Sequence, residues 1–141
     1  MSKAKFRAMR EQSGYSQLAL ANAIGVKVLT IKRWEHEKQT AQPSPDAWEL
    51  LEQTLAAQRE AADYAVEVAL QAEELPNSPR KAVLTYYRDQ AMYDAYGRDE
   101  GYFGVANANA RAAGEALGLE GFEVEYRYPT EGAISTPGSR Y

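Results

Sequence analysis

Residues 14–37, GYSQLALANAIGVKVLTIKRWEHE, constrain this chain most, because their pattern predicts two short helices joined by a tight turn. Gly25 stands at the turn, where a residue without a Cβ adopts a positive φ without steric cost. Ser16 is a good N-cap for the first of the two helices, and Gly14 suits the end of the helix before it. We therefore expect helices over residues 3–13, from residue 16 to 24, and over 27–37.

The third of these helices carries apolar residues at a spacing that predicts one buried face. Val26, Ile31 and Trp34 fall on that face, so the opposite face is left for solvent or a partner. Two short helices joined in this way have the layout of a helix-turn-helix, in which the second helix enters the major groove of DNA. The segment therefore predicts a DNA-binding domain.

A resemblance to a known family rests on these residues. Residues 6–38 resemble the helix-turn-helix of Cro/C1-type (XRE) phage and bacterial transcription regulators. The matches are Gly14, Ser16-Gln17, Leu20-Ala21, Gly25-Val26, Thr30-Ile31 and Trp34-Glu35. Lys27, Lys32 and Glu37 depart from the family pattern, in which the first two positions often hold Ser or Thr and the third holds Gly. The resemblance implies a five-helix-type domain, double-stranded DNA as partner, and a link to phages or mobile elements.

The geometry of such a domain assigns roles to individual side chains. The predicted base-reading residues are Lys27, Val28, Leu29, Lys32 and Arg33. The predicted phosphate contacts are Arg10, Ser16, Gln17, Thr30, Lys38, Gln39 and Thr40. Two alternatives stay open. Val28 and Leu29 could belong to the core, which would rotate the reading face, and Lys32 and Arg33 could form an ordinary solvated face.

Composition removes several other functions. The chain has no cysteine and a single histidine, His36, which argues against disulfides, thiolate metal sites and a histidine-based metal or catalytic centre. We see no nucleophile–base pair and no Gly-rich phosphate loop, so we expect no enzyme, no cofactor and no metal. No apolar run approaches the roughly 20 residues of a membrane helix. The expected location is the cytoplasm.

The charge distribution favours a basic binding head on an acidic body. The net charge is −4 overall, but residues 1–50 carry +3 and the remaining 91 residues carry −7. A basic N-terminal part attracts phosphate, while an acidic remainder is repelled by it.

Beyond the first three helices, the pattern predicts further helix, then a boundary, then a small α+β unit. Residues 46–74 contain no helix-breaking residue and form one helix or two. Two prolines within residues 75–79 mark the boundary. Strands are predicted over 82–87 and 122–128, with helices over 89–96 and 102–117 between them. The chain is thus mainly α, with a DNA-binding domain over 1–75, a β-α-α-β domain over 79–128 and a loose tail over 129–141.

Two strands bury little on their own, which predicts that the C-terminal unit pairs with a second copy. That part is also similar to the tail of anti-CRISPR-associated autorepressors, through Pro79-Arg80, Val83-Leu84, Tyr86-Tyr87 and the segment 120–124, EGFEV. The leading interpretation is a homodimeric repressor that binds inverted-repeat operators. The alternative is an antitoxin-like or accessory regulator whose C-terminal half binds a protein partner. Eight of the ten tyrosines follow residue 79, so RNA also stays open as a partner.

Overall fold

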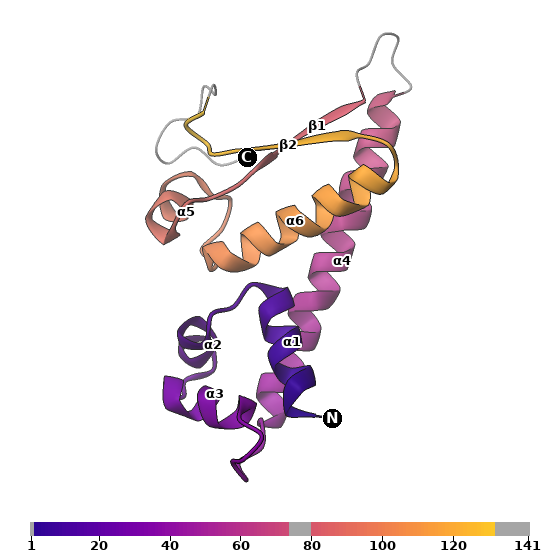
Figure 1. Cartoon of the computed structure of the whole chain (residues 1–141). Helices are drawn as coiled ribbons and strands as arrows, with labels where there is room; N and C mark the ends of the chain where they lie inside the picture. The colour runs from indigo at the N-terminus through magenta and orange to yellow at the C-terminus, as the bar shows by residue number, and fades with distance from the viewer. Residues whose placement is uncertain (1, 74–79, 132–141) are drawn as a thin grey trace. The chain divides into compact units, whose positions relative to one another are not determined.

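The helices of the N-terminal part follow the predicted caps. The computed structural model describes residues 2–73 and 80–131. Its first elements are α1 (Lys3–Ser13), α2 (Gln17–Ile24), α3 (Val28–Glu35) and α4 (Pro45–Glu73) (Figure 1). Gly14 ends α1 with a φ of 94°, and Gly25 ends α2 with a φ of 75°, both in the left-handed region that favours glycine. The predicted boundaries of the first two helices are therefore confirmed.

The third helix is shorter than predicted. It begins after Lys27, which provides no side-chain cap, and ends at Glu35 rather than at residue 37. His36 leaves the helix with extended backbone angles, φ −92° and ψ 122°. The reason lies in tertiary contacts that the local pattern does not contain, and these are described with the site below.

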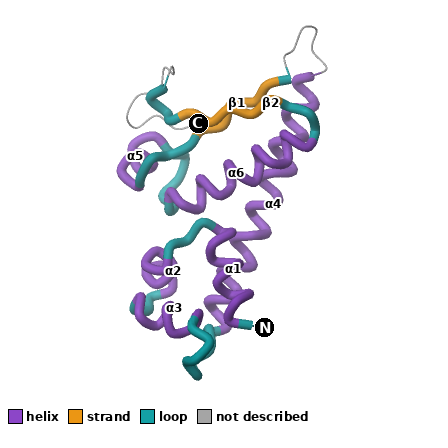
Figure 2. The backbone as a smooth tube through the Cα atoms, viewed as in Figure 1, coloured by secondary structure: helices purple, strands orange, loops and turns teal. Residues whose placement is uncertain are grey.

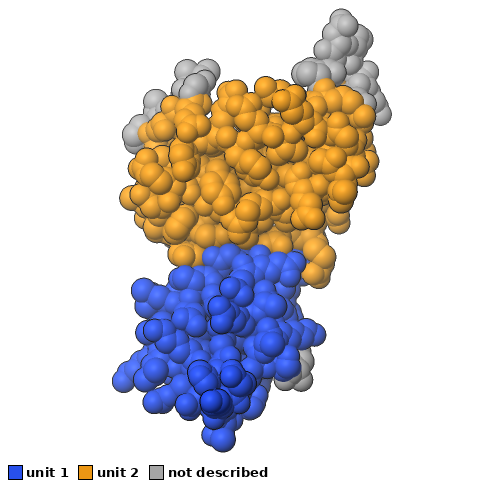
Figure 3. Space-filling view, viewed as in Figure 1, with its two compact units in different colours: residues 1–57 blue, residues 58–141 orange. Residues whose placement is uncertain are grey.

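Residues 45–73 form one continuous helix, where the sequence left open one helix or two. Ser44 caps its start by accepting the Ala47 N–H at 3.2 Å, and Pro45 occupies the first helical position. The chain divides into two compact units, residues 1–57 and 58–141 (Figure 3). The division between these units falls within α4, and the boundary that the sequence predicts at residues 75–79 lies outside the described ranges.

One apolar cluster forms the core of the N-terminal unit. Phe6 is fully buried, and its ring packs edge to face against Trp34 at 5.9 Å and Trp48 at 5.2 Å between ring centroids. The cluster also contains Leu20, Ala21, Ile31, Ala47 and Leu51. All four helices contribute to it, which fixes α3 against α1, α2 and the beginning of α4.

The C-terminal unit has the predicted β-α-α-β order. Its elements are β1 (Lys81–Thr85), α5 (Gln90–Tyr96), α6 (Phe103–Leu119) and β2 (Glu123–Arg127). The two strands are parallel, with Val83 in register with Glu125, and α6 runs along one face of the sheet (Figures 1 and 2). Parallel pairing follows from the helical connection, because a crossover returns the chain to the same end of the sheet. The mainly α architecture with a small α+β unit is confirmed.

Two details of the strands differ from the sequence prediction. The first strand ends at Thr85 rather than at residue 87, and both backbone groups of Tyr87 bond to the side chain of Asn107 instead of to another strand. The alternation of residues 122–128 predicts that Tyr126 faces a core, but Tyr126 is 42% exposed and lies beside a groove along α6. The sequence pattern predicts that Asn107 lies on the helix surface or bonds to a second subunit, whereas it is buried and bonds to Tyr87 of the same chain. Of the predicted tail, residues 132–141 lie outside the described ranges.

Candidate nucleic-acid interface

The first and second helices of the predicted motif are joined as the sequence indicates. The Ser16 hydroxyl accepts the Ala19 N–H at 3.0 Å, which satisfies one free donor at the start of α2. After Gly25, the N–H of Val26 donates to the carbonyl of Ala21 at 3.0 Å, so the turn into α3 is closed by a backbone hydrogen bond. The helix pair therefore has a fixed geometry.

The outward face of α3 is cationic with one apolar side chain. Lys27, Lys32 and Arg33 are exposed, and Leu29 is 51% exposed between them. Within residues 2–73 and 80–131, none of the three cations forms an ion pair. The opposite face carries Ile31 and Trp34 into the core. Four of the five predicted base-reading residues thus lie on one open surface.

Val28, the fifth, is placed differently. It is half-buried and packs against the core cluster, while its neighbour Leu29 points outward. Thr30 is also half-buried, and its N–H donates to the carbonyl of Lys27 at 2.9 Å at the first turn of α3. The open alternative of a core role therefore applies to Val28 and not to Leu29.

Arg10 is not where a phosphate contact requires it. Its side chain is 8% exposed and pairs with Glu35, whose side chain is 4% exposed, at 2.5 Å between Nε and Oε2. A second guanidinium nitrogen donates to Glu35 Oε1 at 3.0 Å, and Nη1 donates to the carbonyl of Tyr15 at 2.9 Å. We therefore correct the role of Arg10 from phosphate contact to positioning residue. It ties the end of α3 to α1 and to the segment before α2.

Gln17 joins the same network from the start of α2. Its Nε2 donates to Glu35 Oε1 at 3.2 Å, while its residue remains half-exposed. One carboxylate therefore connects α1, α2 and α3. Such a buried charge is tolerated because its oxygens are fully used by charged and polar donors.

Lys3 holds the other end of this arrangement and was not identified from the sequence. Its Nζ donates to the carbonyls of Arg33 at 3.0 Å and Trp34 at 3.2 Å, and also to that of Ala41. The last carbonyls of a helix have no partner within the helix, and a cation near them is stabilising. Lys3 therefore ends α3 and fixes the loop that follows, which explains why α3 stops at Glu35.

That loop carries the remaining predicted phosphate contacts. Lys38, Gln39 and Thr40 are all exposed. The loop turns back on His36, whose carbonyl accepts the Gln39 N–H at 3.1 Å and whose Nδ1 accepts the Lys38 N–H at 3.1 Å. Of the other predicted phosphate contacts, Ser16 is exposed as these loop residues are, and Gln17 is half-exposed.

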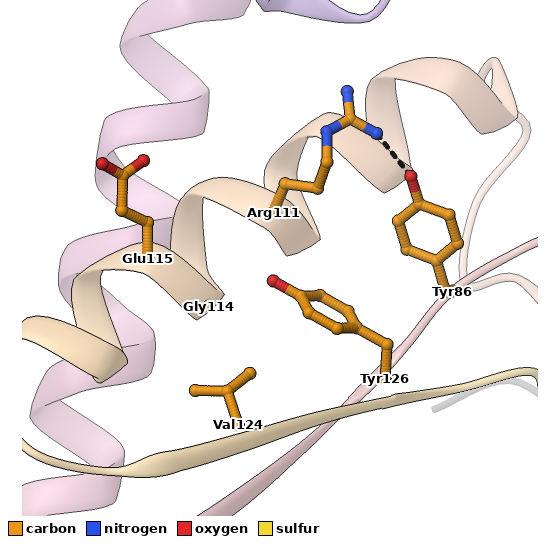
Figure 4. Close-up of a pocket in the computed structure, with 6 residues that line it drawn as sticks. All are labelled: Tyr86, Arg111, Gly114, Glu115, Val124 and Tyr126. Carbon is orange, nitrogen blue, oxygen red and sulfur yellow. Dashed lines mark hydrogen bonds between the residues drawn. The ribbon is translucent and has the colours of Figure 1, made fainter.

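The tyrosine-rich half divides into buried and surface rings. Tyr87 and Tyr93 are buried and pack edge to face at 4.8 Å between centroids. Tyr86 and Tyr126 instead line a shallow groove of about 560 Å³ beside α6, where Arg111 donates to the Tyr86 hydroxyl at 2.5 Å (Figure 4). Within the described ranges, the tyrosines thus do not form a single stacking surface for bases.

Comparison with known proteins identifies the N-terminal part. Residues 6–63 match the family model described as Helix-turn-helix. The match supports the Cro/C1-type interpretation of this part and, with it, a DNA-binding regulator. No curated protein matches the chain, and nothing found supports the likeness of the C-terminal part to anti-CRISPR-associated autorepressors.

Across the described residues, no helix is long and apolar enough to cross a membrane. In the same ranges, no group of three or more His, Cys, Asp or Glu residues is arranged to hold a metal ion.

Proposed function

We propose that this helix-turn-helix chain is a sequence-specific transcriptional regulator that acts as a homodimeric repressor. The observation that carries the proposal is the exposed face of α3, where Lys27, Lys32 and Arg33 lie without ion-pair partners in the described residues. A stable surface of unpaired cations on a helix suits the phosphate-lined major groove of DNA.

The side chains on this face divide into readers and anchors. Arg33 can donate two hydrogen bonds to O6 and N7 of one guanine, and Lys32 can reach a guanine or a phosphate. Leu29 has no hydrogen bond to offer, so it favours contact with a thymine methyl group. Gln17, at the N-terminus of α2, and the loop residues Lys38 and Gln39 would hold the phosphate backbone. Affinity should therefore fall steeply as salt concentration rises.

Dimerisation is supported by the small C-terminal sheet. It has two strands, and such a sheet is rarely stable without further partners. Two copies would place two α3 helices on half-sites about 34–36 Å, or a multiple of this, apart along the DNA. The operator would then be an inverted repeat.

Selection of bound sequences from random double-stranded DNA tests this function. We expect an enriched inverted repeat, and Arg33→Ala should weaken its binding by about 1–3 kcal/mol and relax selectivity at one base pair. The matched control is Arg98→Ala, which removes the same charge from an exposed position in the C-terminal unit. Absence of any enriched sequence, or equal losses in the two variants, would contradict the proposal.

Repression is tested separately, in cells that carry a reporter gene behind the selected operator. Expression of the chain should lower the reporter signal, and Arg33→Ala should restore it. A rise in the reporter signal on expression of the wild-type chain would show an activator instead.

The groove beside α6 favours one second function, a regulator whose C-terminal half binds a protein partner. Gly114 opens the groove, because a Cβ there would collide with the Tyr126 hydroxyl and approach Val124 Cγ1 to 3.3 Å. Arg111 would offer its guanidinium to an acidic or aromatic side chain. A stoichiometric protein that copurifies with the full chain, but not with Arg111→Ala, would favour this function. Either function is one of binding, and we propose no catalytic activity.

A further inference from the structure

The outer edge of β1 is a row of backbone groups directed away from the sheet. The N–H of Tyr86 donates to the carbonyl of Arg127 at 2.9 Å, and the N–H of Glu123 donates to the carbonyl of Arg80 at 2.8 Å. These two bonds show that the even-numbered residues of β1 pair with β2. Because backbone groups alternate in direction along a strand, those of Lys81, Val83 and Thr85 point to the opposite edge. Within the described ranges, no hydrogen bond to these backbone groups is found.

Asn107 sets one limit of this open edge. Its Oδ1 accepts the Tyr87 N–H at 2.8 Å, and its Nδ2 donates to the Tyr87 carbonyl at 2.7 Å. The amide side chain thus satisfies the two backbone groups that follow Thr85 in the alternating series. The open row is therefore confined to the three residues of β1 itself.

We propose that the β1 edge binds the β1 edge of a second copy in antiparallel orientation, with the two-fold axis at Val83. Lys81 would then lie opposite Thr85 of the second copy, and Val83 opposite its own equivalent. All three outward residues would be paired, which gives about six interchain hydrogen bonds. The result is a four-stranded sheet, and the inference rests on the dimeric part of the proposed function.

Registers with the two-fold axis one residue away would leave some of the outward backbone groups of β1 without a hydrogen-bond partner. With the axis at Leu84, Lys81 would lie opposite Tyr87, whose backbone groups already bond to Asn107. With the axis at Ala82, Thr85 would lie opposite a position before the beginning of β1. The register centred on Val83 is therefore the one in which each outward group finds a partner.

Side chains also suit this pairing. Val83, at the middle of the outward row, is an apolar side chain that is 51% exposed, and an exposed apolar position on a strand edge favours pairing with another strand. Lys81 would face a threonine, and Ala82 would face Leu84 of the second copy, a small residue opposite a large one. No like charges are opposed in this register, which removes the main penalty for cross-strand pairs.

The outer edge of β2 is less suitable for self-pairing. With the two-fold axis at Glu125, this carboxylate would lie opposite its own copy. With the axis at Val124, Glu123 would lie opposite Glu125 of the second copy. Centring the axis on Tyr126 requires the carbonyl of Tyr128, which already accepts the Glu131 N–H at 3.0 Å. Both the charges and the hydrogen bonds therefore select β1.

The first experiment measures the dimer dissociation constant of the full chain by sedimentation equilibrium. Val83→Lys should raise it on the order of tenfold or more, because two ammonium groups would meet at the axis. Within one copy the new lysine lies in register with Glu125, so the fold should persist, as circular dichroism will show. The control Val83→Thr keeps a β-branched residue and should dimerise like the wild type.

The second experiment traps the interface, since the chain contains no cysteine. Val83→Cys should form an interchain disulfide on oxidation, because paired residues in antiparallel strands have Cα atoms about 5.5 Å apart, within the disulfide range. Glu123→Cys, at an exposed position of β2, should not form an interchain disulfide. Equal cross-linking of the two variants, a dimer unaffected by Val83→Lys, or a wild-type monomer at tens of micromolar would each overturn the proposed interface.

A DNA-binding measurement distinguishes failure of the proposed β1 interface from failure of the proposed function. A single half-site, identified in the DNA selection, should bind Val83→Lys as well as it binds the wild type, while binding to the full inverted repeat weakens. If Val83→Lys dissociates the dimer but neither protein binds DNA, the interface stands and the regulatory function falls. If DNA binds but Val83→Lys changes neither assembly nor repeat binding, the interface falls alone.

Discussion

The N-terminal unit gathers apolar side chains from α1 to α4 in one cluster, whereas the C-terminal unit buries them on α6 and in a small cluster past β1 and leaves both strands at least partly exposed. Phe6, Leu20, Ile31 and Leu51 are fully buried in the first unit. In the second, Val83 and Tyr126 remain 51% and 42% exposed, and the buried cluster of Tyr87, Met92 and Tyr93 lies past the end of β1.

This difference in burial leaves different kinds of groups exposed on the two units. In the N-terminal unit all four helices pack in one buried core, so the fold does not depend on the exposed cations of α3. These cations are therefore available to bind a partner. In the C-terminal unit the outward backbone groups of β1 have no hydrogen-bond partner among the described residues, and Val83 beside them is exposed. Under the proposed function, the first unit would recognise DNA and the second would join two copies of the chain.

Among the substitutions that test this difference between the units, Phe6→Ala has the largest expected effect. It should lower the unfolding free energy of the N-terminal unit by about 3–5 kcal/mol. Both tryptophans of the chain contact this ring, so urea unfolding followed by tryptophan fluorescence will measure the loss. The control is Leu18→Ala, whose side chain is 58% exposed and should cost at most about 0.5 kcal/mol. Amide resonances of β1 and β2 should stay at their wild-type positions, and their collapse in Phe6→Ala would show that the units are not separate.

Glu35→Gln comes next, because it leaves the buried charge of Arg10 without its counterion. We expect a loss of about 3 kcal/mol in the unfolding free energy, at the lower end for a broken buried pair because the amide keeps some hydrogen bonds. Glu11→Gln breaks the exposed pair with Arg7, whose side chains are 56% and 61% exposed, and should cost under about 1 kcal/mol. Similar losses in the two variants would remove the special role of this carboxylate.

Within the C-terminal unit, Asn107→Leu should cost about 2 kcal/mol, because two backbone groups of Tyr87 lose their partners. The matched variant lies on the same helix. Asn109 has a buried Oδ1 without a hydrogen bond among the described residues, so Asn109→Leu should be neutral or stabilising. Thermal unfolding of both variants measures the difference, and a larger loss for Asn109→Leu would refute this account of the end of β1.

The smallest expected effect is an acid-dependent loss of stability in the sheet. Hydrogen bonds from Arg127 and Lys81 lower the pKa of Glu125 below its ordinary value of 4.5. Its contribution is thus complete above pH 4.5 and is lost as the pH falls through the lowered pKa. Unfolding measured from pH 6 to 2, about the range over which such a group titrates, should show a shallower decline for Glu125→Gln than for the wild type. The control Glu123→Gln should retain the full decline.

The elements that the sequence predicted well are those fixed by neighbouring residues. Gly14, Ser16 and Gly25 act within one turn of their own positions, so the ends of α1 and the limits of α2 follow from local pattern. The exposure of Lys32 and Arg33 can also be predicted from local pattern, because the helical spacing of Ile31 and Trp34 decides which face of α3 is buried.

What the sequence did not predict depends on residues far apart in the chain. Lys3 reaches the carbonyl of Arg33 over 30 positions, and Arg10 reaches Glu35 over 25. Asn107 reaches Tyr87 over 20, and on α6 it resembles any polar surface residue. A local pattern cannot distinguish a charged residue that caps a distant helix from one that is merely solvated, and the early end of α3 follows from such a contact.

The position of Lys3 also affects any study that labels the chain through its amines. An acyl group on Nζ would cancel the charge and the hydrogen bonds that end α3, so the labelled molecule would carry an altered loop after residue 35. Lys5 is exposed one half-turn away and offers an internal reference. The ratio of the two labelling rates is therefore a chemical measure of how firmly the end of α3 is held, and it needs no DNA in the assay.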